Sequence, residues 1–118
     1  MNRTRLALAA AVLALAVAAV PALGATPKLT GTDGPGFTIT LKKGSTKVTK
    51  VKAGKYTITV NDLSSSHNFH LTGPGLNKKT EVSFQGKKTW TVTLKKGKTY
   101  KYVCDPHASF MKGSFKVT

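Results

Sequence analysis

Side chains that bind soft metal ions occur in two groups along this 118-residue chain. The first group is His67, in the middle of the sequence. The second is segment 104–111, which contains Cys104, His107 and Met111 in a Cys-x2-His-x3-Met pattern. Two imidazoles and a thiolate with a weak axial thioether suit copper that alternates between Cu(I) and Cu(II). Zinc sites more often use further cysteines or histidines, so the sequence predicts one copper ion bound by these four side chains.

Cys104 is the only cysteine in the chain. Thiols normally pair in the oxidising compartments that exported proteins enter, so an unpaired cysteine there is either a route to unwanted dimers or a metal ligand. The imidazole and the thioether that follow it favour the ligand. The alternative interpretation, a core thiol with two unrelated histidines, requires the spacing to arise by chance.

A second histidine, His70, follows His67 by three residues. Side chains separated by an odd number of positions point to opposite faces of a strand, so both imidazoles cannot face one metal ion. His67 shares its face with Phe69 and Leu71, whereas His70 shares its face with Thr72. We therefore expect His67 to be the ligand and His70 to lie on the surface.

Short runs that alternate apolar residues with threonine make up most of the chain after residue 36. This period of two is typical of strands that bury one face and expose the other, and Lys-Gly pairs at 43–44 and 96–97 are typical of tight turns. About eight such strands predict an all-β fold, a two-sheet Greek-key β-sandwich. The expected strands are 37–41, 47–51, 56–60, 67–72, 80–84, 90–94, 98–104 and 114–117.

The first 25 residues have the layout of a secretory signal peptide: a basic start, an apolar run over residues 6–20 and small residues up to Ala25. An uncleaved membrane anchor is the alternative interpretation. Residues 26–36 are rich in Gly, Pro and Thr and are expected to form a flexible linker. Residues 37–118 are then the copper-binding domain of an exported protein, periplasmic or extracellular in a bacterial envelope.

The chain is strongly basic, with 19 Lys and Arg, 4 Asp and Glu, and a formal net charge of +15. Both arginines, Arg3 and Arg5, lie in the signal segment, so its removal lowers the charge by two, to +13. Lysine without arginine provides point charges and no bidentate forks, which disfavours nucleic acid as the partner. The charge predicts either an acidic partner or simply a solvated basic surface.

Taken together, these residues resemble the cupredoxins, the plastocyanin and azurin group of small blue copper proteins, over essentially the whole mature chain. The resemblance rests on an early His-Asn pair at the start of a strand and on the Cys-x2-His-x3-Met loop before a final strand. The Cys-Asp-Pro-His tetrapeptide is similar to the Cys-x-Pro-His of plastocyanins. The segment between His107 and Met111 is one residue shorter than is usual in plastocyanins, and the resemblance still implies Met111 as the axial ligand.

The resemblance also implies roles for the neighbours of the ligands. Asn68 is expected to stabilise the ligand loop and to donate a backbone hydrogen bond to the thiolate, and Asp105 to bind Asn68 from the loop. Pro106 has no N–H, so it cannot provide a second hydrogen bond to the sulfur, which lowers the expected copper potential. In the family the second histidine is the electron exit, here His107, with a rim formed by Ala108, Phe110 and Pro74.

By this resemblance the protein is a one-electron carrier and not an enzyme. We expect a monomer whose partner is an acidic redox protein such as a cytochrome or an oxidase, and contact with a membrane surface stays open. Two other function classes also remain open. One is a copper-binding carrier or resistance protein; the other is a metal-free interaction module that binds anionic polymers or lipids through its lysines. Adding Cu(II) to the apoprotein identifies the metal-free module, because a type 1 site turns intensely blue or green and the module stays colourless. A reversible redox couple with fast self-exchange distinguishes the electron carrier from a copper carrier, which binds Cu(I) tightly and oxidises slowly.

Overall fold

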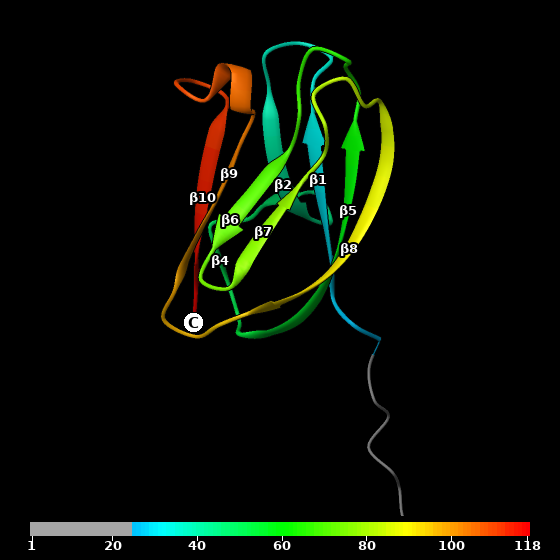
Figure 1. The fold of residues 1–118 in the computed structure, drawn as a ribbon. Helices are drawn as coiled ribbons and strands as arrows, with labels where there is room; N and C mark the ends of the chain where they lie inside the picture. The colour runs from blue at the N-terminus through cyan, green and yellow to red at the C-terminus, as the bar shows by residue number, and fades with distance from the viewer. Residues whose placement is uncertain (1–24) are drawn as a thin grey trace, which may run out of the picture.

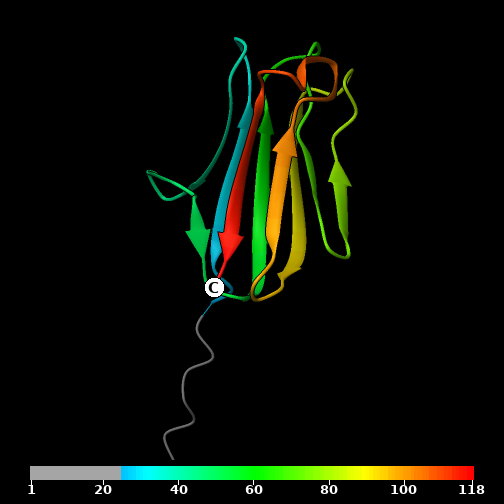
Figure 2. The ribbon, with the colours of Figure 1, turned by 90° about the vertical axis from the view of Figure 1, so that its left-hand side faces the viewer.

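The computed structural model describes residues 25–118, which form ten strands in two sheets that pack face to face (Figure 1 and Figure 2). The predicted all-β sandwich is confirmed. The predicted signal segment lies outside the described residues except for its last residue, Ala25. Within residues 25–118, no helix is long and apolar enough to cross a bilayer.

The first sheet contains, in spatial order, β3 (Thr46–Lys47), β2 (Ile39–Lys43), β1 (Lys28–Asp33), β5 (Gly54–Asp62) and β8 (Gly86–Leu94). β1 pairs in parallel with β5 and antiparallel with β2, and β5 pairs antiparallel with β8 along its whole length. Because β1 and β5 run in the same direction, their last residues lie side by side at one end of the sandwich.

The second sheet contains, in spatial order, β4 (Lys50–Val51), β10 (Lys112–Val117), β9 (Thr99–Val103), β6 (His70–Gly73) and β7 (Leu76–Lys79). β9 is antiparallel to both of its neighbours, so the end of β9 lies beside the start of β6 and the start of β10. A short 3-10 helix, η1 (Asp105–His107), lies in the loop from β9 to β10. This loop and the one before β6 therefore meet at one end of the sandwich (Figure 1).

The core between the sheets is apolar and rich in aromatic rings. Ile58 is fully buried, the Phe69 ring stacks on Tyr102 with centroids 5.5 Å apart, and Tyr100 stacks on Phe115 at 5.7 Å. Fully burying a side chain of this kind contributes about 1.5–3 kcal/mol. The stacked pairs tie β9 to the loop before β6 and to β10, which are the elements that carry the predicted ligands.

The predicted flexible linker, residues 26–36, is wrong for residues 28–33, which form strand β1 in the middle of the first sheet. The alternation is present but disguised, since two of its three inward residues are Gly31 and Asp33 beside a single apolar one, Leu29. A Cβ atom at Gly31 would approach the Phe69 ring to 2.8 Å. Packing against this ring therefore requires a glycine where a sequence pattern looks for an apolar residue.

Four other predicted strands are wrong at an end, in the middle or throughout. The strand expected over 47–51 is divided, since Thr46–Lys47 forms β3 in the first sheet and Lys50–Val51 forms β4 in the second. Residues 80–84 form a loop, in which the Phe84 N–H donates to the Glu81 carbonyl. The strand expected over 67–72 begins only at His70. The strand expected from Phe37 begins at Ile39, because the pairing of β1 with β2 ends at the Asp33–Ile39 pair.

Candidate metal centre

The loop from β9 to β10 is folded by its own backbone hydrogen bonds. The Cys104 N–H donates to the Met111 carbonyl at 3.0 Å, and the N–H groups of His107 and Met111 donate to the carbonyls of Cys104 and His107 at 3.0 and 2.8 Å. Pro106 lies in the first turn of η1, where its missing N–H costs nothing and its fixed φ is suitable. These bonds bring the three predicted ligands of segment 104–111 to one side of a compact turn.

His67 comes from a different segment, the loop between β5 and β6. Its N–H donates to the Ser64 carbonyl at 3.3 Å, which turns the chain just before the ring. The side chain points inward and is only 3% exposed. His70 lies on the other side of the backbone, where its ring binds Asp105 at 2.8 Å and Asn77 at 2.6 Å. The structure thus separates the two histidines and leaves His70 out of the cluster.

His67, Cys104 and His107 bring three donor atoms together. The Nδ1 atoms of the two histidines are 3.1 Å apart, and Cys104 Sγ lies 3.7 Å from His67 Nδ1 and 3.5 Å from His107 Nδ1. Within residues 25–118, this is the one group of three His, Cys, Asp or Glu side chains suited to holding a metal ion. Carboxylates are absent from the group, which argues against the oxygen-binding ions Ca²⁺ and Mg²⁺.

The size of this triangle fits a transition-metal ion. A point equidistant from the three donor atoms lies about 2.0 Å from each of them, close to ordinary metal–nitrogen distances and slightly short of metal–sulfur distances. The lone pairs of two unprotonated Nδ1 atoms 3.1 Å apart would repel each other, so a cation or a proton is needed between them. The arrangement is therefore complementary to a trigonally bound cation.

Met111 is buried beside this triangle, with 1% of its surface exposed. Its backbone is hydrogen-bonded to both Cys104 and His107. An axial bond from the thioether to the metal stays a prediction. Burial of the thioether means that solvent does not compete for that side of the site.

Asn68 and Asp105 connect the two segments that carry the ligands. The Asn68 N–H points to Cys104 Sγ at 3.5 Å, while the Asn68 side chain accepts from the Asp105 N–H and donates to the Asp105 carboxylate, both at 2.7 Å. The same side chain donates to the Thr80 carbonyl at 3.1 Å. Thr80, which sequence reasoning missed, is fully buried and its hydroxyl accepts from the Phe69 N–H. No local pattern marks Thr80, because its contacts lie eleven or more residues away.

Burial and hydrogen bonds set the acidity of two groups in the loop. Burial raises the pKa of the Cys104 thiol above its usual range, and the Asn68 N–H acts in the opposite direction. Burial also acts to raise the pKa of Asp105, but hydrogen bonds from His70 and Asn68 outweigh it and lower this pKa. Asp105 is thus held as a carboxylate that accepts from both neighbours.

Two exposed phenylalanines cover the site. The Phe37 ring lies 5.3 Å from the His67 ring and 5.1 Å from the His107 ring, and Phe110 lies 5.6 Å from both Phe37 and His107. Phe37 is 65% exposed and Phe110 58% exposed. The rim position of Phe110, which the family resemblance implied beside the alternative of core packing, agrees with this exposure. Phe37 was expected on the inward face of the strand over 37–41, and that prediction is wrong. Phe37 lies beyond the end of the β1–β2 pairing, where side chains no longer alternate between the core and the solvent.

Pro74 does not belong to this rim. It lies in the turn between β6 and β7, and β6 runs away from the metal end after His70. Pro74 is therefore separated from His107 by the length of the strand (Figure 1).

The comparison with protein families decides what this arrangement is. Residues 39–118 match the family described as copper binding proteins, plastocyanin/azurin family. The chain belongs to this family. Copper is accordingly its cofactor, and His67, Cys104 and His107, with Met111 beside them, form a site like the type 1 copper site of cupredoxins. Among curated proteins, no sequence matches this cupredoxin significantly.

Solved cupredoxin structures share the fold. Reduced rusticyanin superimposes with a TM-score of 0.58 at 22% identity, covering 77% of this chain and 78% of that one. A mutant of amicyanin in its reduced Cu(I) form gives a TM-score of 0.51 at 23% identity, covering 80% of this chain and 85% of that one. The two-sheet sandwich of this cupredoxin is therefore shared with known copper proteins of low sequence identity.

Proposed function

We propose that this protein is an exported one-electron carrier, with a single type 1 copper ion bound by His67, Cys104, His107 and Met111. The observation that carries the proposal is the triangle of two Nδ1 atoms and one Sγ, with sides of 3.1 to 3.7 Å. The bound copper would supply the Cu(I)/Cu(II) couple. Export rests on the sequence of residues 1–25, which has the layout of a signal peptide.

Burial of the ligands supports electron transfer over catalysis on a bound substrate. The side chains of His67, Cys104 and Met111 are 3%, 0% and 1% exposed. A catalytic metal site needs an open position for water or substrate. Here three of the four proposed ligands are buried, and the fourth, His107, is only partly exposed. The protein therefore exchanges electrons through its surface and makes no bond to a reactant.

Rigid attachment of the ligands supports the same function. Cys104 and His107 belong to a loop with three internal backbone hydrogen bonds, and Asn68 fastens this loop to the segment of His67. Ligands held this way change position little when the metal charge changes. Because the ligands need to move so little, the activation barrier to electron transfer is low and electron exchange is fast.

The electron exit is proposed to be His107, the partly exposed ligand, within the apolar surface of Phe37 and Phe110. A weak, short-lived redox complex suits a small apolar contact with few charges. The proposed partner is an acidic redox protein, such as a cytochrome or an oxidase, because a net charge of +13 speeds the approach of anions. The carrier is proposed to act as a monomer.

The experiment that tests this function is copper loading of the chain that begins at Ala25, followed by absorption and paramagnetic resonance spectroscopy. We expect an intense charge-transfer band in the visible, a reversible one-electron potential and fast self-exchange. Cys104→Ser should abolish the band, while His70→Gln, a matched histidine change outside the cluster, should retain it. A colourless product would contradict the copper site. A blue protein with tight Cu(I) binding and sluggish oxidation would instead identify a copper carrier.

A further inference from the structure

The acidic residues lie at the end of the sandwich that carries His67, Cys104 and His107, which we call the copper end. Asp33 and Asp62 are the last residues of β1 and β5, and Asp105 belongs to η1. Glu81 lies just after β7, whose last residue pairs with His70. These are all four acids of the whole chain. The other end of the described domain therefore has no acidic residue to balance its cations.

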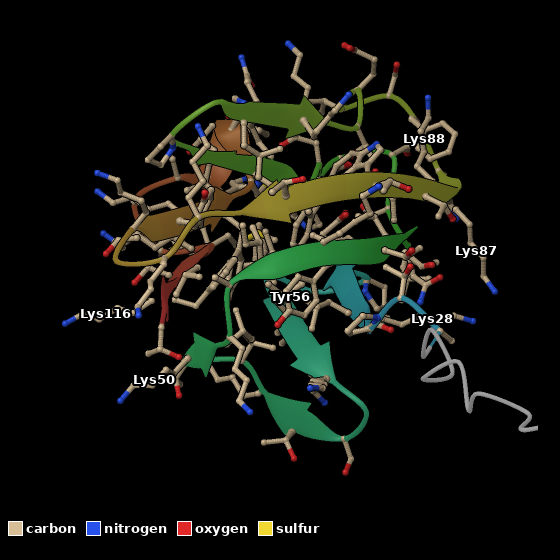
Figure 3. All side chains as sticks on the ribbon, turned by 90° about the horizontal axis from the view of Figure 1, so that it is seen from below. Lys28, Lys50, Tyr56, Lys87, Lys88 and Lys116 are labelled. Carbon is tan, nitrogen blue, oxygen red and sulfur yellow. The ribbon has the colours of Figure 1, made fainter. Side chains whose placement is uncertain are left out.

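The opposite end carries a concentration of lysines, which we call the lysine end. It is formed where β1, β5 and β9 begin and where β2, β8 and β10 end, together with the loops that join them. Figure 3 views this end, with Lys28, Lys50 and Lys116 pointing away from the body of the domain. The exposed lysines of this end are Lys28, Lys43, Lys50, Lys52, Lys55, Lys95, Lys96, Lys98 and Lys116.

Two hollows in the surface of the lysine end have lysines as their only charged side chains. The smaller, of about 370 Å³, is lined in part by Lys50, Lys98 and Lys116. The larger, of about 560 Å³, shares Lys50 with it and is also lined by Lys43, Lys52 and Lys55. Positive side chains thus continue across the end from one hollow to the next.

None of these lysines is neutralised within the described domain. Among residues 25–118, the one ion pair joins His70 to Asp105, at the copper end. Like charges that are crowded on one surface repel one another, and this repulsion is relieved when the surface meets an anionic one. The lysine end is therefore the surface that an extended anion would select over the copper end.

Two features favour a lipid surface over a shaped anionic ligand. Lysines provide mobile point charges, which suit a fluid layer of headgroups better than a fixed bidentate contact. In addition, the chain enters the domain at this end, since Pro27 lines the larger hollow and its carbonyl accepts from the Thr57 N–H. In the sequence, the apolar run of residues 6–20 is joined to the domain through this segment. Along the chain, the lysine end is therefore the part of the domain nearest to this apolar run.

We propose that the lysine end binds the surface of an anionic lipid bilayer, so that the copper end faces away from the membrane and stays accessible to a redox partner. Binding is electrostatic and reversible, and it requires neither the copper ion nor the residues that cover it. This inference therefore stands apart from the proposed electron transfer.

The test is sedimentation with lipid vesicles, using the chain that begins at Ala25 so that the apolar run does not insert. Both sheets and the whole core lie within residues 28–118, so this chain contains the complete fold. The vesicles contain phosphatidylcholine alone or with about one third phosphatidylglycerol, at low and at high salt. We expect binding only to the anionic vesicles and its loss at high salt.

Matched variants locate the binding surface. The first replaces Lys50, Lys52 and Lys55 by Gln at the lysine end, and the second replaces Lys87, Lys88 and Lys112 by Gln at the copper end. Each removes the same charge from exposed positions, and unchanged melting temperatures establish that both are folded. We expect the first to weaken vesicle binding on the order of tenfold or more and the second to weaken it far less.

Three outcomes would overturn the proposal. Equal weakening by the two variants would show that net charge alone matters and that the lysine end has no special role. Absence of binding to anionic vesicles at low salt would remove the lipid surface as the partner. Binding to soluble long-chain polyphosphate without binding to vesicles would assign the lysine end to a polyanion instead.

Discussion

The backbone N–H of Asn68 lies 3.5 Å from Cys104 Sγ, although the two residues are 36 positions apart in the sequence. Both are almost completely buried, with 1% and 0% of their surfaces exposed. An N–H that points at a thiolate away from water stabilises its negative charge more strongly than it would in solvent. This single contact therefore connects the segment that carries His67 to the sulfur ligand and also modifies the electron density of that ligand.

Asn68→Ala should loosen the ligand loop, because it removes the side-chain hydrogen bonds to Asp105 and Thr80 while the backbone N–H remains. We expect the free energy of unfolding to fall by about 1–3 kcal/mol, the usual cost of leaving buried polar groups unpaired. Urea unfolding of the copper-free protein measures it. The control is Asn77→Ala, which removes one exposed contact with His70. An equal loss in both variants would assign no special role to the Asn68 side chain.

Pro106→Ala should raise the reduction potential of the copper. The new N–H at the start of η1 can point towards the thiolate, and a hydrogen bond to sulfur stabilises the reduced, less positive site. A net contribution of about 1 kcal/mol corresponds to about 40 mV for one electron. Voltammetry measures the change, with Ser109→Ala as a control for an exposed change in the same loop. A potential that falls or stays constant contradicts this prediction.

Asp33→Asn should change how stability depends on pH. Asp33 and Asp62 are adjacent in the β1–β5 register and 0% and 1% exposed, and neither Asp33 carboxylate oxygen has a hydrogen-bond partner within residues 25–118. Burial, and then the Asp62 carboxyl, raise the pKa of Asp33 from 3.8 to about 8. Between about pH 4 and pH 8, the folded protein therefore keeps Asp33 protonated, whereas the unfolded chain releases this proton.

The sign of the effect follows from the raised pKa. The contribution of Asp33 to stability is complete below about pH 4 and is lost as the pH rises to about 8. We expect Asp33→Asn to flatten this fall, so that the variant melts at a higher temperature than the natural protein above pH 8. Calorimetry of the copper-free proteins over this range measures it, with Glu81→Gln as an exposed acid control. Parallel curves for the Asp33 variant and the natural protein would exclude a proton held at Asp33.

Phe37→Ala should slow electron exchange without removing the copper. The Phe37 ring lies against both imidazoles, so truncating it admits water to the ligands and shrinks the apolar contact surface. We expect the visible band to remain and the self-exchange rate to fall on the order of tenfold, since water that reorients around the site raises the barrier. Line broadening in NMR of mixed oxidation states measures the rate. The control is Leu63→Ala, which truncates another exposed apolar residue, 45% exposed, and should leave the rate unchanged.

The identity of the metal could be predicted from the sequence because ligand chemistry is local. Cys104, His107 and Met111 fall within eight consecutive residues, and their donor atoms suit copper whatever fold surrounds this segment. The alternation of threonine with apolar residues likewise predicted β5 and β8, since the period of a strand depends only on neighbouring positions. The same alternation predicted that His67 and not His70 is the ligand, but β6 begins only at His70, so in the structure the loop before β6 separates the two side chains.

What surrounds the metal was decided by tertiary structure. Phe37 covers the imidazoles because β2 pairs with β1 only from Ile39 onward, and Thr80 anchors Asn68 although its own segment is a loop. Asp33 meets Asp62 through a register between strands 29 positions apart. The separation of lysines from acids also follows from strand direction, which places the starts of β1, β5 and β9 at one end. Composition gives the charge of a chain, but pairing distant strands decides where that charge lies.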